Sequence, residues 1–107
     1  MRFDVYLKKL NEALGSSKKF SFTEKPDQTG RSVIRIGMVD GGKSVLLAEI
    51  GYSANGYAKA SRAMNIYRDG NKSTYNTDGK YMASVLNDYL NGLGAPVSIP
   101  AQYIKHG

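Results

Sequence analysis

The stretch that decides the fold reads RSVIRIGMVDGGKSVLLAEIGY, from Arg31 to Tyr52. It contains two runs of β-branched and aliphatic residues, separated by the polar break Asp40-Gly41-Gly42-Lys43. Every second residue from Ile34 to Met38, and again from Leu46 to Ile50, is apolar, as in strands that bury one face. Two such runs around a short Gly-rich break predict a β-hairpin whose apolar faces form the floor of the core.

The same break also matches a phosphate-binding loop. Gly37, four intervening residues and then Gly42-Lys43-Ser44 fit the pattern G-x-x-x-x-G-K-[ST]. That loop needs a buried parallel strand before it and a helix after it, and here Gly51 ends the following apolar run after about two helical turns. The position between two alternating runs therefore predicts a hairpin turn with no nucleotide function.

Composition limits the classes of function. The chain has 107 residues, which is enough for one domain, and its net charge of +6 favours polyanionic partners. It has no cysteine and a single histidine, His106, so thiolate metal sites and histidine-based catalytic triads are excluded and no cofactor is expected. No apolar run approaches the roughly 18 residues of a membrane span. Met1 precedes a charged amphipathic segment, so we expect a cytoplasmic protein with no membrane partner.

An amphipathic helix is predicted at the N-terminus. Phe3, Leu7, Leu10 and Leu14 share one helical face, and Gly15 suits the position after the helix. The segment from 20 to 23 then alternates aromatic and polar residues, as a half-buried strand does. A turn-rich segment leads from this strand to the central hairpin.

The segment from 53 to 67 has two interpretations. Tyr57, Met64 and Tyr67 share one helical face, and nearby alanines favour a helix, which is the preferred prediction. The alternative is a strand from Met64 to Tyr67, with Asp69-Gly70 as a hairpin turn. The chain from 68 to 80 is predicted to be a polar loop or a short hairpin.

A final helix is predicted after Asp78, which can cap it. Its apolar face carries Met82, Val85, Leu86, Tyr89 and Leu93, and its polar face places Asn87, Asp88 and Asn91 in solvent. In the tail beyond this helix, Val97 and Ile99 are expected to pack against a sheet edge or a partner.

Together these elements predict an α+β protein in which a three-stranded antiparallel sheet packs against an N-terminal helix and one or two later helices. We expect a single domain over 1–107, with an α-β-β-β-α unit over 1–67 and a loop, helix and tail over 68–107. The predicted interior residues are Leu7, Leu10, Ile36, Leu86 and one of Leu46 and Leu47, with the alternation favouring Leu46.

Three short motifs are similar to the double-stranded RNA-binding domain, over roughly Phe3 to Tyr67. They are Leu10-Asn11-Glu12 in the first helix, Pro26-Asp27-Gln28 in the first loop, and Ala58-Lys59 with Arg62-Ala63 in the second helix. This chain departs from the family at two places. Gln28 stands where the family often has a histidine, and Ala54-Asn55-Gly56-Tyr57 stands where the family has paired lysines. The resemblance implies that the first helix and loop reach two minor grooves, while the second helix grips phosphates between them.

The leading hypothesis is a non-enzymatic protein that binds the phosphate backbone of nucleic acid. Duplex RNA or DNA is preferred over single strands as its ligand. The predicted contacts are Gln28, Arg31, Lys59 and Arg62, which also rest on the resemblance, and Lys8 and Lys9, which rest on charge. No pair of carboxylates has a spacing that suggests acid–base catalysis, and no serine has a nearby base, so no enzyme is expected.

Two alternatives remain open. Tyrosines interleave with lysines and arginines from 57 to 81, which is typical of single-strand binders, although Tyr57, Tyr67 and Tyr81 are more simply explained as core residues. The other alternative is a small phage- or mobile-element-type protein that binds an acidic protein and inhibits or modulates it.

Overall fold

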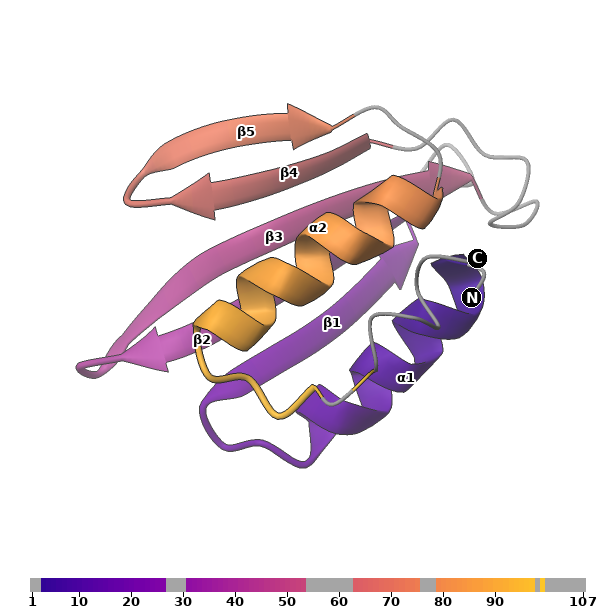
Figure 1. Ribbon diagram of the computed structural model, residues 1–107. Helices are drawn as coiled ribbons and strands as arrows, with labels where there is room; N and C mark the ends of the chain where they lie inside the picture. Colours follow the sequence, from indigo (N-terminus) through magenta and orange to yellow (C-terminus); the bar gives the residue numbers. More distant parts are fainter. Residues whose placement is uncertain (1–2, 27–30, 54–62, 76–78, 98, 100–107) are drawn as a thin grey trace.

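The computed structural model has two layers, a sheet of five strands and a pair of helices that cover one face of it (Figure 1). It describes residues 3–26, 31–53, 63–75, 79–97 and 99. The helices are α1 (Phe3–Gly15) and α2 (Gly79–Gly92). The strands are β1 (Phe20–Pro26), β2 (Arg31–Asp40), β3 (Lys43–Ser53), β4 (Ala63–Arg68) and β5 (Asn71–Tyr75).

The sheet is an antiparallel meander in which each strand pairs with the next along the chain, in the order β1-β2-β3-β4-β5. The α+β class is confirmed, but the sheet has five strands rather than the predicted three. The count of three omits β4, whose residues the preferred prediction assigned to a helix, and β5, which lies in a segment predicted as a polar loop or a short hairpin. The predicted strand after α1 and the predicted central hairpin are both present, as β1 and as β2 with β3.

The break between β2 and β3 is a hairpin turn, as predicted. Asp40 pairs with Lys43 across it, and Gly41 and Gly42 both have positive φ, at 58° and 84°. Positive φ at both central positions is the geometry of the tightest hairpin turns and strongly favours glycine. The phosphate-loop pattern is therefore a turn between antiparallel strands, not a link from a parallel strand to a helix.

A β-bulge shifts the register of β3 next to this turn. Ile36 pairs with Ala48, but the following residue, Gly37, pairs with Leu46, so Leu47 is an extra residue in β3. An extra residue of this kind changes which side chains face inward. Leu47 is consequently buried and Leu46 is exposed, which makes the preference for Leu46 as the interior residue wrong.

The predicted helix over 53–67 is wrong for its C-terminal part. Residues 63–67 belong to β4, where Met64 pairs with Ile50 on one side and with Tyr75 on the other. Asp69 and Gly70 form the turn to β5, so the strand alternative for Met64 to Tyr67 is confirmed. Residues 54–62 lie outside the described part of the chain. The hydrogen-bonding edge of β3 decides this region, since it offers β4 a partner that a local pattern does not reveal.

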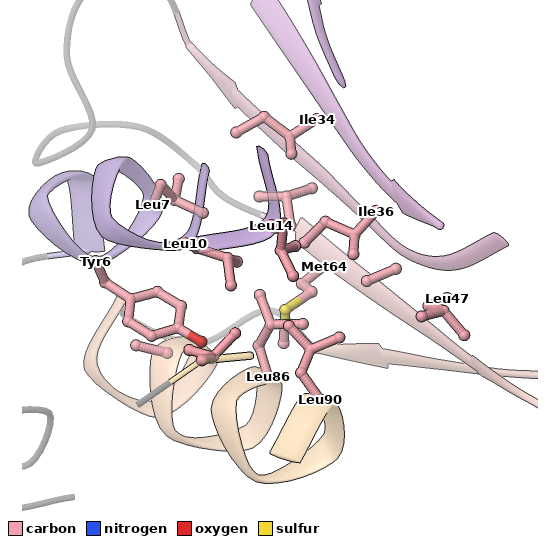
Figure 2. Close-up of a cluster of buried hydrophobic side chains, with 14 of the residues drawn as sticks. Tyr6, Leu7, Leu10, Leu14, Ile34, Ile36, Leu47, Met64, Leu86 and Leu90 are labelled. Carbon is pink, nitrogen blue, oxygen red and sulfur yellow. The ribbon is translucent and has the colours of Figure 1, made fainter. Parts of the chain in front are cut away.

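The core lies between the sheet and the two helices (Figure 2). The predicted interior residues Leu7, Leu10, Ile36 and Leu86 are buried. In Figure 2, Tyr6 of α1 points its ring toward α2. Of the tail residues, which were predicted to pack against a sheet edge or a partner, Val97 is buried in the core and Ile99 packs against it.

Asn87 is the exception on α2, because it is buried rather than solvent-facing as predicted. The hydroxyl of Tyr6 donates a hydrogen bond to Asn87 Oδ1 at 3.3 Å, across the interface between the helices. Burial, with a smaller effect from the negative charge of Asp88, raises the pKa of Tyr6 well above its usual value. The amide on an otherwise apolar stripe is explained by this partner, which is 81 residues away in the sequence.

Candidate nucleic-acid interface

The face of the sheet opposite the helices carries a polar row that crosses all five strands. The pairings align Thr23 with Arg35, Arg35 with Glu49, Glu49 with Asn65 and Asn65 with Thr74. Their neighbours along each strand, such as Ile34, Ile36 and Ile50, are buried under the helices. Because side chains alternate between the two faces of a strand, this row belongs to the face that the helices leave uncovered. We call it the open face.

Neighbouring side chains of this row contact one another. Arg35 Nε donates a hydrogen bond to Glu49 Oε2 at 2.9 Å, and Thr74 Oγ1 donates to Asn65 Oδ1 at 2.8 Å. Thr23 Oγ1 donates to the carbonyl oxygen of Arg35 at 3.4 Å. The side chain of Arg35 is 52% exposed and that of Glu49 is 28% exposed, so solvent reaches the ion pair. The row keeps its hydrogen-bonding groups accessible to a ligand.

Cations outnumber acids on the open face. Its described charged side chains are Lys25 on β1, Arg35 on β2, Lys72 on β5 and the single acid Glu49. Lys25 and Lys72 lie on the two edge strands, about 19 Å of sheet width apart at ordinary strand spacing. Tyr67 is half-buried and pairs across the hairpin with Lys72, so an aromatic ring and a cation lie side by side at one edge. Tyr67 is therefore not the core residue that the simpler explanation of the tyrosines expected.

The bulge hollows the open face between β1 and β3. A pocket of about 270 Å³ lies there, with Gly37 among its lining residues. A Cβ atom at Gly37 would lie 3.0 Å from the carbonyl oxygen of Val45, so glycine permits this close approach of two strands. The other lining residues are Ser21, Thr23, Arg35, Ser44, Val45 and Leu46.

A second hollow lies in the helical layer, between the end of β4 and α2. It has a volume of about 500 Å³ and is lined by Arg68, Val85, Asp88, Tyr89, Gly92 and Leu93. The guanidinium carbon of Arg68 lies 4.8 Å from the centre of the Tyr89 ring, which is a cation–π contact. The hydroxyl of Tyr89 donates a hydrogen bond to the carbonyl oxygen of Tyr67. Burial raises the pKa of Tyr89, although the positive charge of Arg68 opposes that shift.

Of the six residues predicted to contact nucleic acid, the structure describes the side chains of two, Lys8 and Lys9. Lys8 and Lys9 are exposed on α1, in the helical layer and therefore away from the open face. Arg31 begins β2 and pairs with Ser53, but its side chain is not among those described. Gln28, Lys59 and Arg62 lie outside the described residues.

The predicted contacts of the leading hypothesis did not include the open-face cations Lys25 and Lys72, although Lys72 belongs to the tyrosine-interleaved basic segment of the single-strand alternative. The available signal was strand alternation, which places Lys25 two residues after Thr23 and Lys72 two residues before Thr74. The same signal did place Arg35 on a solvated face, and Arg35 is exposed.

Within the described residues, no group of three or more histidine, cysteine, aspartate or glutamate side chains is placed to hold a metal ion. None of the described helices has the length and hydropathy needed to cross a membrane.

Comparison with known proteins gave no match for this chain among protein-family models, curated proteins or solved structures.

Proposed function

We propose that this protein is a non-enzymatic nucleic-acid-binding protein that contacts the phosphate backbone through the open face of its sheet. The observation that carries the proposal is the charge of that face, where the described charged side chains are three cations, Lys25, Arg35 and Lys72, and one acid, Glu49. Lysine and arginine that neutralise phosphates release condensed counterions, which drives binding without regard to sequence. The side-chain amide of Asn65, whose Oδ1 accepts from Thr74, and the terminal N–H groups of the Arg35 guanidinium supply additional donors for phosphate and sugar oxygens.

The open face supports this function better than the helical surface does. The preference for duplex nucleic acid depended on a helix over 53–67, and residues 63–67 of that segment form part of β4. Tyr67 beside Lys72 adds a ring on which an unpaired base can stack, next to a cation for its phosphate. Single strands are therefore compared with duplex RNA and DNA in the test.

The test is a set of charge variants matched between the two layers. Lys25→Ala and Lys72→Ala remove cations of the open face, whereas Lys8→Ala and Lys9→Ala remove exposed cations of α1. Fluorescence anisotropy with labelled single strands and duplexes, from about 50 to 200 mM salt, measures affinity and its salt dependence. We expect each open-face variant to weaken binding and to reduce the salt slope by about one contact, and each α1 variant to change both much less.

A charge-gain pair makes the test sharper. Glu49→Gln and Glu12→Gln change the net charge equally, but Glu49 lies on the open face and Glu12 is exposed on α1. We expect Glu49→Gln to bind nucleic acid more tightly, because it removes the acid that pairs with Arg35. Equal effects of the two variants would mean that only the net charge matters. Absence of binding by the unaltered protein at about 50 mM salt would refute the proposal.

One observation favours a second function, the binding and modulation of an acidic protein partner. Three of the four large apolar side chains that are exposed among the described residues, Val39, Val45 and Leu46, lie on the β2–β3 hairpin. Exposed apolar groups beside lysines suit a protein surface better than a phosphate backbone.

A further inference from the structure

Among the described residues, one edge of β3 has no neighbouring strand. β4 pairs with β3 only from Ala48 to Gly51, whereas β3 begins at Lys43. Over residues 43–47, the only described strand that pairs with β3 is therefore β2. Figure 1 shows the β4–β5 hairpin diverging from β3 toward this end of the sheet. Residues 43–46 are all exposed.

The register shows which backbone groups face outward on this edge. Asp40 and Lys43 close a two-residue turn, so they form a hydrogen-bonded pair and the next pair, Val39 with Ser44, does not. Val39 supports this assignment, because its N–H points away from β3 and donates to the carbonyl oxygen of Lys19 at 2.9 Å. By the same alternation, the N–H and C=O groups of Ser44 and Leu46 point away from β2. Within the described chain, these four groups have no hydrogen-bond partner.

The end of β4, which lies across from this edge of β3, differs from it because its outward carbonyl group has a partner. Arg68 and Asn71 close the turn of the second hairpin, so the carbonyl group of Tyr67 points away from β5 and toward β3. The hydroxyl of Tyr89 on α2 donates to this carbonyl group, which no described strand pairs with. The end of β4 is satisfied by a side chain, whereas the edge of β3 is left open.

Apolar side chains and Lys43 flank the open edge, and further cations lie at the same end of the sheet. Val45 and Leu46 are 41% and 37% exposed, and Lys43 is exposed beside them. Exposed cations outnumber exposed acids around the two turns, the connection from α1 to β1 and the C-terminal half of α2. The cations are Lys18, Lys19, Lys43, Arg68 and Lys72, and the acids are Asp40, Asp69 and Asp88.

We propose that residues 43–47 of β3 bind an extended acidic peptide segment of a partner protein, which adds a strand to this edge. Only a polypeptide can pair with the outward N–H and C=O groups of Ser44 and Leu46 as a strand does. The surplus of cations selects acidic residues, and Val45 and Leu46 offer contacts to apolar residues that alternate with them. A second copy of this chain is a poor occupant, because it carries the same net charge of +6. This proposal does not rest on nucleic-acid binding, and it gives the protein-partner alternative a definite site.

The first experiment uses a synthetic peptide on the unaltered protein. The probe is a capped seven-residue peptide that alternates valine and glutamate, titrated into ¹⁵N-labelled protein and followed by NMR. We expect the amide signals of Ser44 and Leu46 to shift and to become protected from hydrogen exchange. Two matched probes follow: a peptide with lysine in place of glutamate, and a glutamate peptide N-methylated along one edge. Both should bind at least about tenfold more weakly, since one reverses the charge and the other removes ladder donors.

A proline pair tests the edge from the side of the protein. Ser44→Pro removes an outward N–H and leaves the β2–β3 ladder intact, because Ser44 donates no hydrogen bond to β2. Thr74→Pro makes the equivalent change on the outer edge of β5, where Thr74 also faces away from its partner strand. We expect Ser44→Pro to lower the affinity for the glutamate peptide at least about tenfold and Thr74→Pro to leave it nearly unchanged. If Ser44→Pro does not fold, the N-methylated peptide on the unaltered protein decides the question.

Several results would overturn the proposal. These are an absence of peptide binding at millimolar concentration, equal binding of the N-methylated or lysine peptides, and peptide-induced shifts that avoid residues 43–47. Self-association that Ser44→Pro abolishes would identify a second copy as the occupant. Shifts of the Ser44 and Leu46 amides by nucleic acid in place of the peptide would assign this edge to the nucleic-acid interface. A failure of the nucleic-acid test leaves these readouts unaffected, so the two proposals can fail separately.

Discussion

The two hairpins of the sheet end in the same kind of turn but form for different reasons. Both turns place two residues at positive φ, Gly41 and Gly42 in one and Asp69 and Gly70 in the other. The strands of the β2–β3 hairpin have 10 and 11 residues with a clear apolar alternation. Those of the β4–β5 hairpin have 6 and 5, with only Met64 and Ile66 alternating as buried residues in β4 and with polar residues from Asn71 to Thr74 in β5. The first hairpin is encoded by its own sequence. The second depends on the neighbours β3 and α2.

The largest predicted change in the free energy of unfolding tests whether the β4–β5 hairpin contributes to the core as much as the β2–β3 hairpin does. Ile36 of β2 and Ile66 of β4 are both completely buried. We expect Ile36→Ala and Ile66→Ala each to lower the free energy of unfolding by about 2–5 kcal/mol, measured by urea denaturation. Val39→Ala, at a residue that is 48% exposed, is the control and should cost less than about 0.5 kcal/mol. A loss below about 1 kcal/mol for Ile66→Ala would make β4–β5 a marginal addition to the sheet.

A smaller effect tests the bulge, which distinguishes the first hairpin from the second. We expect Gly37→Ala to cost about 1–3 kcal/mol, because its Cβ would press against the backbone carbonyl of Val45. Gly51→Ala is the matched control on the neighbouring strand, since a Cβ at Gly51 meets nothing within 4 Å. Its effect should stay within about 1 kcal/mol of zero, measured in the same urea titrations. Equal losses for the two variants would mean that the close approach at the bulge is not what requires glycine.

The smallest effect compares one cross-strand pair in each hairpin. Arg35 and Glu49 join β2 to β3 through an exposed ion pair, and Asn65 and Thr74 join β4 to β5 through a neutral hydrogen bond. Double-mutant cycles with alanine should give coupling energies of about 0.2–1 kcal/mol for each pair. Raising salt to about 1 M should reduce the Arg35–Glu49 coupling and leave the Asn65–Thr74 coupling almost unchanged. Equal salt sensitivity would contradict the ionic character of the first pair.

Local patterns predicted those elements whose apolar spacing fits one structure alone. Leu7, Leu10 and Leu14 fit only a helix, and the residues around the Gly41-Gly42 turn fit only a hairpin. In β4 the spacing is ambiguous, because Met64 and Tyr67 share a helical face while Met64 and Ile66 share a strand face. The pairing with β3 resolves that ambiguity, and it is a contact between segments that a local pattern does not contain.

The errors at single residues have the same origin. A bulge inserts one residue into β3 without altering its composition, so alternation alone chose Leu46 where Leu47 is buried. Asn87 is polar and was assigned to solvent, but its partner Tyr6 lies at the other end of the chain. For the nucleic-acid contacts, charge alone selected Lys8 and Lys9, which are exposed on α1 and lie away from the open face. Which cations share a face depends on strand register, which composition does not specify.

The contact between Tyr6 and Asn87 joins α1 to α2, the first and last described helices, and this bears on the order in which the protein folds during synthesis. Each strand pairs with the one just before it, so the sheet can assemble step by step as the nascent chain leaves the ribosome. With α1 alone on it, the apolar side of that sheet stays partly exposed until α2 has also emerged, because Leu86 and Leu90 belong to the same core. The nascent chain therefore passes through a stage in which the strands are paired but part of the apolar face is still exposed to water. Exposed apolar surface of this kind is what chaperones bind.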